Sequence, residues 1–337
     1  MHKPLMIVGE AWGEQEEQKG RAFAGPSGSV LYGLLRQAGI DPKDCYFTNV
    51  FNFRPRNNSV NSLFTGKSDA IPLYRPIAPG KYVDKRYLPE IERLFEEIER
   101  TRPNLILALG NTPLWAICKK AGVKKYRGSP LYSHDQKWKV LPTWHPAAIL
   151  RQWELRAIAL ADITKARTEM EFPELNRPKH LIYMEPDLED IEAFYETHLK
   201  GQPFLSCDIE TKERTITEVG YSTADGSRAI VIPFWSRTAA DGNYWPHAWQ
   251  EKRAWEWVRR INAEFKLVGQ NFSYDMQYFW RTVRIPCPNF GGDTMLQHHA
   301  MQPELEKGLG FLGSVYTNEP SWKFMRTDHS TLKREDN

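Results

Sequence analysis

Short apolar runs alternate with segments of helical periodicity along the first half of the chain, and this alternation limits the folds open to it. Strands are predicted at residues 5–8, 46–51, 104–109 and 140–143, and helices at residues 30–37, 89–100 and 112–120. Such an order favours a parallel sheet with helices on both faces, in which ligands bind at the carboxyl ends of the strands. We therefore expect an α/β domain whose functional residues follow its strands.

A second cycle of strands and helices begins after a stretch that reads as a linker. Residues 171–180 hold two prolines and little apolar periodicity. Strands are predicted beyond it at 181–184, 204–209, 217–221, 228–233 and 267–270, and helices at 187–199, at 249–264 and from residue 274. The strands at 217–221 and 228–233 read as an antiparallel pair, so the second sheet is expected to be mixed. With the linker between the two cycles, we predict two α/β domains. The first is a parallel-sheet domain over 1–170, and the second is a mixed-sheet domain over 181–337.

Length and composition set the broad class of protein. The 337 residues are enough for about two domains, each with its own core. No run of 18 or more apolar residues occurs, and the first residues do not read as a signal peptide, so we expect no membrane association and a cytoplasmic location, the host cytoplasm if a phage encodes the chain. The net charge of +3 neither demands nor excludes nucleic acid. Residues 54–85 are rich in Asn, Ser, Pro and Gly and read as a long loop or insertion.

Four polar or glycine-rich elements follow the predicted strands of the first domain in a fixed order. The first strand leads into Glu10 and Ala11, then Glu16, and then a glycine-rich stretch that contains Phe23. Asn49 stands at the end of the second strand, and Asn111 and Thr112 follow the third strand and its glycine. His145-Pro146 follows the last strand, with Arg151 shortly after it. A glycine-rich loop alone is a weak signal, but four elements in one order are more specific.

Taken together, these elements resemble the uracil-DNA glycosylase superfamily, most closely its family-4 type. The resemblance implies that Phe23 stacks on an extruded uracil, Asn49 pairs with its Watson–Crick edge and His145 stabilises charge at uracil O2. It also implies that Glu10 and Glu16 position or polarise the attacking water and screen the base. Ala11 and Arg151 are further candidate substrate contacts.

Three features depart from the family-4 pattern. Trp12 stands where the family usually has proline, and Ala147 stands where a serine commonly follows His-Pro. The four cysteines that many family-4 enzymes use for an iron–sulfur cluster are absent, since only Cys45 and Cys118 lie in this half. We therefore expect a glycosylase domain without a cofactor and without an iron–sulfur cluster.

The second domain has acidic residues at the ends of its predicted strands. Asp208 and Glu210 lie two residues apart on one strand and therefore project from the same face. Co-directed carboxylates repel each other unless a cation joins them, which favours a divalent metal. Asn271 and Asp275 follow the strand at 267–270, and Asp293 comes later.

This set resembles the DnaQ-like 3′–5′ exonuclease domain of family A DNA polymerases. The resemblance implies that Asp208, Glu210 and Asp275 hold Mg²⁺ or Mn²⁺, and that Thr211 and Asn271 contact the terminal nucleotide. Asp293 would be structural or would support these ligands. The third motif of that family, a Tyr or His four residues before an Asp, does not occur in the tail, although Asp328 and Asp336 are present there. Either the exonuclease is weak or inactive, or the missing carboxylate comes from a separately encoded polymerase chain.

Two hypotheses of function follow. In the first, the chain is a DNA enzyme that excises uracil and also contains a proofreading-type exonuclease domain, as the N-terminal part of a split or truncated phage-type polymerase. In the second, it is a non-catalytic sensor of uracil or of a modified base that acts as a scaffold in a replication complex; Trp12 and Ala147 favour this reading. DNA is the expected partner in both.

Overall fold

The structure is a computed structural model that describes residues 2–320, and it divides the chain into two compact units. Unit 1 comprises residues 1–177 together with the segment that begins at Gly310, and unit 2 comprises residues 178–309. The linker was predicted close to this division. The segment after Gly310 was predicted in the second domain, but it packs with unit 1 because its helix accepts hydrogen bonds there from Arg127 and Lys165. Asp328 and Asp336 lie outside the described residues.

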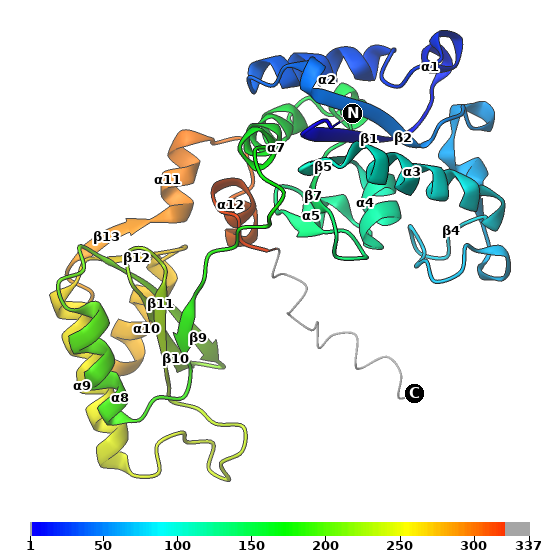
Figure 1. Ribbon diagram of the computed structural model, residues 1–337. Helices are drawn as coiled ribbons and strands as arrows, with labels where there is room; N and C mark the ends of the chain where they lie inside the picture. Colours follow the sequence, from blue (N-terminus) through cyan, green and yellow to red (C-terminus); the bar gives the residue numbers. More distant parts are fainter. Residues whose placement is uncertain (1, 321–337) are drawn as a thin grey trace. The chain divides into compact units, whose positions relative to one another are not determined.

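Unit 1 is built on a five-stranded sheet in the order β2-β1-β5-β7-β6 (Figure 1). The neighbours β2, β1, β5 and β7 run parallel, and β6 pairs antiparallel with β7 at the edge. Its strands are β1 (Leu5–Ala11), β2 (Cys45–Phe51), β5 (Leu105–Leu109), β6 (Leu131–Tyr132) and β7 (Lys139–Thr143), with a separate ribbon of β3 (Phe64–Thr65) and β4 (Tyr82–Val83). The predicted parallel-sheet α/β architecture is confirmed.

Helices cover both faces of this sheet because alternate residues of its buried strands point to opposite sides. Met6 and Val8 of β1 pack in one cluster with α3 and α4, whereas Leu5 and Ile7 pack in another with α2 and α7. The helices of unit 1 are α1 (Glu14–Lys19), α2 (Pro26–Gln37), α3 (Leu88–Thr101), α4 (Asn111–Cys118), α5 (Val123–Tyr126), α6 (Pro146–Arg151), α7 (Leu155–Glu169) and α12 (Leu309–Tyr316). Among the described residues, no helix is long and apolar enough to cross a membrane.

Unit 2 has a mixed six-stranded sheet in the order β13-β12-β9-β10-β11-β8. The pairs β9–β10 and β10–β11 are antiparallel, and the other neighbours are parallel. The strands are β8 (Leu181–Tyr183), β9 (Leu205–Lys212), β10 (Thr215–Ser222), β11 (Arg228–Pro233), β12 (Leu267–Gly269) and β13 (Phe290–Asp293). The helices are α8 (Leu188–Phe194), which continues as a π-helical turn over Tyr195–Leu199, α9 (Ala248–Glu264), α10 (Ser273–Val283) and α11 (Thr294–Met301). The predicted mixed α/β sheet is confirmed.

A buried ion pair joins three elements of unit 1. Asp162 on α7 accepts hydrogen bonds from the Nε atom of Arg127 at 2.9 Å, from its Nη2 atom, and from the hydroxyl of Thr143 at 2.7 Å. Arg127 also donates to the hydroxyl of Ser314 on α12 at 2.9 Å. Both charged side chains are almost fully buried, with 4% and 1% of their surfaces exposed. A buried charge requires such partners.

The substitution Asp162→Ala tests how much unit 1 depends on this pair. It leaves the Arg127 guanidinium buried without a counter-charge, so we expect unit 1 to lose about 3 to 5 kcal/mol of its free energy of unfolding. Glu99→Ala is the control, since it breaks an exposed ion pair with Lys137 and is expected to cost less than about 1 kcal/mol. Urea unfolding curves measure both, and equal midpoints for the two variants would contradict the expectation.

Candidate functional site

The predicted site residues of unit 1 lie at the carboxyl ends of its parallel strands. Glu10 stands near the end of β1, and Asn49 lies on β2 opposite Gly9 in the parallel register. His145 follows β7 and caps the start of α6. Because β1, β2 and β7 run parallel within one sheet, their carboxyl ends meet at one edge. The structure thus brings these three side chains to the same edge, although they are far apart in the sequence.

Phe23 and Asn49 approach each other closely because residue 9 has no side chain. A Cβ atom on Gly9 would lie 2.2 Å from Oδ1 of Asn49 and 2.7 Å from Cζ of Phe23, which no real side chain could tolerate. Phe23 itself has a left-handed backbone, with φ of 54°. A Cβ atom on Gly28 would lie 1.9 Å from the carbonyl oxygen of Phe23. The absence of a side chain at Gly9 therefore lets the Phe23 ring and the Asn49 amide lie next to each other, and its absence at Gly28 leaves room for the backbone of Phe23.

Asn49 is 2% exposed, and its backbone is held on both sides. Its N–H donates to Oδ1 of Asn52 at 3.2 Å, and Arg93 donates to its carbonyl oxygen at 2.9 Å. Within the described residues, the side-chain amide makes no hydrogen bond, so both its donor and its acceptor remain available to a ligand. Sequence reasoning missed Arg93, whose only signal was its place within a predicted helix.

Glu16 holds the glycine-rich loop in place. Its two carboxylate oxygens accept hydrogen bonds from the backbone N–H groups of Gly13 at 3.1 Å and Gly25 at 2.8 Å. The loop between these glycines contains Phe23. The carboxylate of Glu16 is therefore engaged with the backbone on both sides of α1, and it positions the loop that contains the aromatic ring.

Glu10 accepts a hydrogen bond from the hydroxyl of Thr112, the second residue of α4. Burial raises the pKa of Glu10, and the Thr112 hydrogen bond and the positive charge of Arg151 oppose that rise. Thr112 follows a buried strand and a glycine and belongs to the third of the four ordered sequence elements, although no role was predicted for it. Ala11 ends β1 opposite Phe51 and offers only its backbone and a methyl group.

His145 is held as a neutral hydrogen-bond donor. The N–H of Ala147 donates to Nδ1 of His145 at 3.1 Å, so Nδ1 is unprotonated and the ring proton lies on Nε2. Burial, and to a smaller extent the charge of Arg151, lower the pKa of His145 to about 4, although the charge of Glu16 partly opposes them. Arg151 is exposed at the end of α6 and acts on both Glu10 and His145.

The cysteines of unit 1 do not fit an iron–sulfur cluster. Such a cluster needs four thiolate ligands, and this unit has only Cys45 and Cys118. Burial raises the pKa of each to about 12, which favours the protonated thiol. No step of any reaction is therefore assigned to a cluster.

In unit 2, the prediction that Asp208 and Glu210 share a face is confirmed. Residues of β9 alternate between buried and exposed, and both carboxylates lie on the exposed side. Asp275 is buried at the start of α10, where its Oδ1 accepts the N–H of Ile209 at 3.0 Å. Thr211, also on β9, shares a hydrogen bond of 2.9 Å with the hydroxyl of Tyr274.

Asp275 and Asp208 interact electrostatically. Burial raises the pKa of Asp275 to about 7, with the negative charge of Asp208 as the next cause. Asp293 has a different role, since it accepts the backbone N–H groups of Asn271 and Phe272 at 3.1 and 2.8 Å and caps α11. Asn271 itself has a left-handed backbone, with φ of 56°.

A metal ion would need several of these carboxylates together. Between residues 2 and 320, no group of three or more His, Cys, Asp and Glu side chains is arranged to hold one. Asp208, Glu210 and Asp275 supply the oxygen ligands that Mg²⁺ prefers, but they do not form a ready site in this arrangement. We therefore derive no reaction step through a metal.

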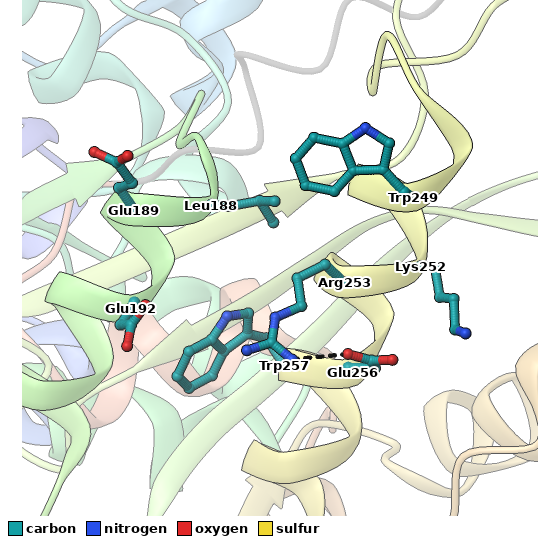
Figure 2. A pocket seen from close by; sticks show the side chains of 8 residues that line it. All are labelled: Leu188, Glu189, Glu192, Trp249, Lys252, Arg253, Glu256 and Trp257. Atoms are coloured by element: carbon teal, nitrogen blue, oxygen red, sulfur yellow. Dashed lines mark hydrogen bonds and ion pairs between the residues drawn. The ribbon is translucent and has the colours of Figure 1, made fainter.

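Two cavities of unit 2 differ in their relation to these residues. One, of about 310 Å³, lies over β9, β10, β11 and β12 and includes Asp208 in its lining. The other, of about 400 Å³, lies between α8 and α9 and contains none of the predicted site residues (Figure 2). It is lined by Leu188, Glu189, Glu192, Trp249, Lys252, Arg253, Glu256 and Trp257.

Comparison with known proteins relates the chain to DNA enzymes. Residues 1–169 match the uracil DNA glycosylase superfamily. The type-4 uracil-DNA glycosylase of Thermotoga maritima is 38% identical over 168 residues, which cover 49% of this chain and 76% of that protein. The corresponding enzyme of Sulfurisphaera tokodaii is 32% identical over 174 residues, which cover 48% of this chain and 68% of that protein.

Two further similarities are weaker. A DNA polymerase of Bacillus phage SP01 is 24% identical over 160 residues, which cover 47% of this chain and 15% of the polymerase. Among solved structures, the EXD2 exonuclease domain soaked in Mg and GMP has 17% identity and a TM-score of 0.26, and the match covers 44% of this chain and 74% of that chain.

The protonation state of His145 can be tested by NMR of its imidazole nitrogens. Since burial disfavours the cation, we expect the ring to stay neutral, with its proton on Nε2, from neutral pH down to about pH 4. The His145→Gln variant assigns the signal by removing it. A midpoint near the ordinary value of 6.5, or a proton on Nδ1, would contradict the geometry.

Proposed function

Because this chain belongs to the uracil-DNA glycosylase superfamily, we propose that it releases uracil from DNA by hydrolysing the bond between the base and its deoxyribose. One observation supports this proposal above the others. The ring of Phe23, the unengaged amide of Asn49 and the Nε2–H donor of His145 belong to one sheet edge. These are the groups that a flipped uracil requires.

Flipping a base out of the duplex costs a few kcal/mol, which contacts in the pocket must offset. Phe23 stacks on the uracil ring. The Nδ2 group of Asn49 donates to uracil O4, and its Oδ1 accepts from uracil N3–H, so both halves of the amide are used. A thymine has the same edge, so any selection against its methyl group comes from the packing around carbon 5.

The bond between C1′ and N1 breaks with both electrons leaving on the uracil, while the sugar becomes cationic. Nε2–H of His145 donates to uracil O2, where negative charge grows, and therefore stabilises the transition state more than the ground state. Glu10 orients the water that adds to C1′ and is itself oriented by Thr112; the proton that this water loses neutralises the uracil anion. Glu16 is a positioning residue that acts through the loop of Phe23, and Arg151 lies close enough to affect both Glu10 and His145.

Uracil release is tested with a 5′-labelled oligonucleotide that holds one internal uracil, incubated in EDTA and then cleaved with hot alkali. We expect one break at the uracil and a loss of about 10² to 10³ in rate for His145→Ala, because an oxyanion donor is removed. Asn49→Ala should also abolish this break, because it removes the amide that pairs with the edge of the uracil.

The matched control is Asp208→Asn, which changes unit 2 and should leave the rate of uracil release unchanged. No break with the unmodified protein would overturn catalytic excision. If the protein then still bound uracil-containing DNA more tightly than ordinary DNA, it would be the non-catalytic sensor, the function that Trp12 and Ala147 favour.

We also propose that unit 2 is a 3′–5′ exonuclease module that requires Mg²⁺ or Mn²⁺. The supporting observation is the pair of Asp275 and Asp208, in which one carboxyl has a pKa of about 7 and would gain from a nearby cation. Glu210 would be the third ligand that this chain supplies, and Thr211 and Asn271 would contact the terminal nucleotide. A further carboxylate would come from a separately encoded polymerase chain, which is the proposed partner besides DNA.

This second activity is tested on an oligonucleotide without uracil. We expect trimming from the 3′ end that depends on Mg²⁺ or Mn²⁺ and disappears in Asp208→Asn, because that substitution removes a ligand charge. His145→Ala is the control and should trim normally. Trimming that persists in EDTA or in Asp208→Asn would contradict the assignment, and so would the absence of both trimming and calorimetric Mg²⁺ binding.

A further inference from the structure

Unit 1 contains a strongly basic segment that the proposed chemistry does not use. Residues 54–86, here called the basic insertion, hold seven Lys or Arg and two Asp, a net charge of +5, whereas the whole chain has +3. They lie between β2 and α3 and include the ribbon of β3 and β4, drawn in cyan in Figure 1. The remainder of the chain is therefore slightly acidic, and the positive charge is concentrated here.

Both acidic residues of the basic insertion are already paired within it. Asp69 pairs with Lys85 at 3.0 Å, and Asp84 pairs with Arg86 at 2.9 Å. Lys67, Arg75 and Lys81 are exposed, and none of them forms an ion pair with another described residue. Arg56 is likewise exposed and unpaired, so four cations of the insertion have no acidic partner among the described residues.

The basic insertion is a built surface. Its side chains Leu63, Ile71, Ile77 and Val83 are buried in the same cluster as the sheet residues of β1 and β5. The ring of Tyr74 packs against Trp115 of α4, with 4.7 Å between centroids. Such anchoring fixes the backbone that presents the cations, so less side-chain and loop entropy is lost on binding.

Its anchors lie at the edge of the sheet where the candidate site lies. Asn111, which directly follows the carboxyl end of β5, donates to the carbonyl oxygen of Ile77 at 3.2 Å. Trp115 donates to the carbonyl oxygen of Arg75 at 2.7 Å. On the other side, the N–H of Trp12, just after β1, donates to the carbonyl oxygen of Phe53 at 3.2 Å, immediately before the insertion. The basic insertion therefore borders the edge that holds Glu10, Asn49 and His145.

We propose that the basic insertion binds the phosphate backbone of the DNA that flanks the flipped base, through Lys67, Arg75 and Lys81. This inference rests on the proposed uracil-DNA activity and adds a second DNA contact outside the base pocket. Exposed cations on an anchored segment can pair with the negative phosphates of a duplex, and each phosphate contact releases bound counterions. Such contacts orient the duplex without reading its sequence.

The test measures binding of a fluorescein-labelled duplex without uracil, in EDTA, between about 50 and 200 mM salt. The variant Lys67→Gln/Arg75→Gln/Lys81→Gln should lower the slope of log affinity against log salt by about 1 per cation. At a given salt concentration it should bind at least about tenfold more weakly. Because this duplex holds no uracil, the readout does not depend on catalysis.

A variant with the same loss of charge at the opposite edge of the sheet is the control. Lys43, Arg102 and Lys137 are exposed and stand shortly before β2, β5 and β7, so Lys43→Gln/Arg102→Gln/Lys137→Gln should keep the slope. The charge-conserving variant Lys67→Arg/Lys81→Arg should also keep it, which separates loss of charge from loss of folding.

Equal slopes for the unmodified protein and the insertion variant would overturn the inference, and so would equal losses in the insertion and control variants. Polyglutamate serves as a second probe that stands for an acidic protein. If the insertion variant bound polyglutamate more weakly but bound the duplex as the unmodified protein does, the surface would belong to an acidic protein partner and the inference would fail. A protein that binds this duplex through the insertion but releases no uracil would leave this inference standing and overturn the proposed activity.

Discussion

The carboxylate of Asp162 is the point on which much of unit 1 depends. It accepts hydrogen bonds from Arg127 and Thr143, which belong to a loop and to the end of β7, while it sits on α7 itself. Because the group is buried, its charge is stable only while all these partners are in place. Thr143 is two residues before His145, so its hydrogen bond to Asp162 also fixes the start of the segment that contains the histidine.

Much of the fold could be predicted from the sequence, because apolar runs and helical periodicity reflect burial directly. The strands β1, β2, β5 and β7 and the helix α3 were predicted close to their observed bounds. The position of α12 could not be predicted, since its place in the sequence puts it next to unit 2. Contacts between residues far apart in the sequence bring it to unit 1: Ser314 accepts hydrogen bonds from Arg127, 187 residues away, and from Lys165.

The sequence allowed the residues of the candidate site to be predicted, but not the contacts that each of them makes. The strand period alone predicted that Asp208 and Glu210 share a face, because side chains alternate along a strand. No sequence pattern shows that Glu16 uses both oxygens on the backbone, or that Thr112 reaches Glu10. Such contacts depend on loops whose conformation requires glycines such as Gly9 and Gly28. Which atoms occupy the space beside a glycine cannot be predicted from the sequence.

The chain returns to unit 1 after residue 309, so unit 2 is inserted in the sequence of unit 1 and both of its ends continue into that unit. Closing a loop costs conformational entropy that grows with the length of flexible chain between its ends. When unit 2 is folded, residues 178–309 hold those ends at a fixed separation, and much of that entropy has already been lost. When unit 2 unfolds, the same residues become a long flexible tether, and the seating of α12 on Arg127 becomes less favourable. Folding of the second unit is thereby thermodynamically linked to the integrity of the first through the covalent chain.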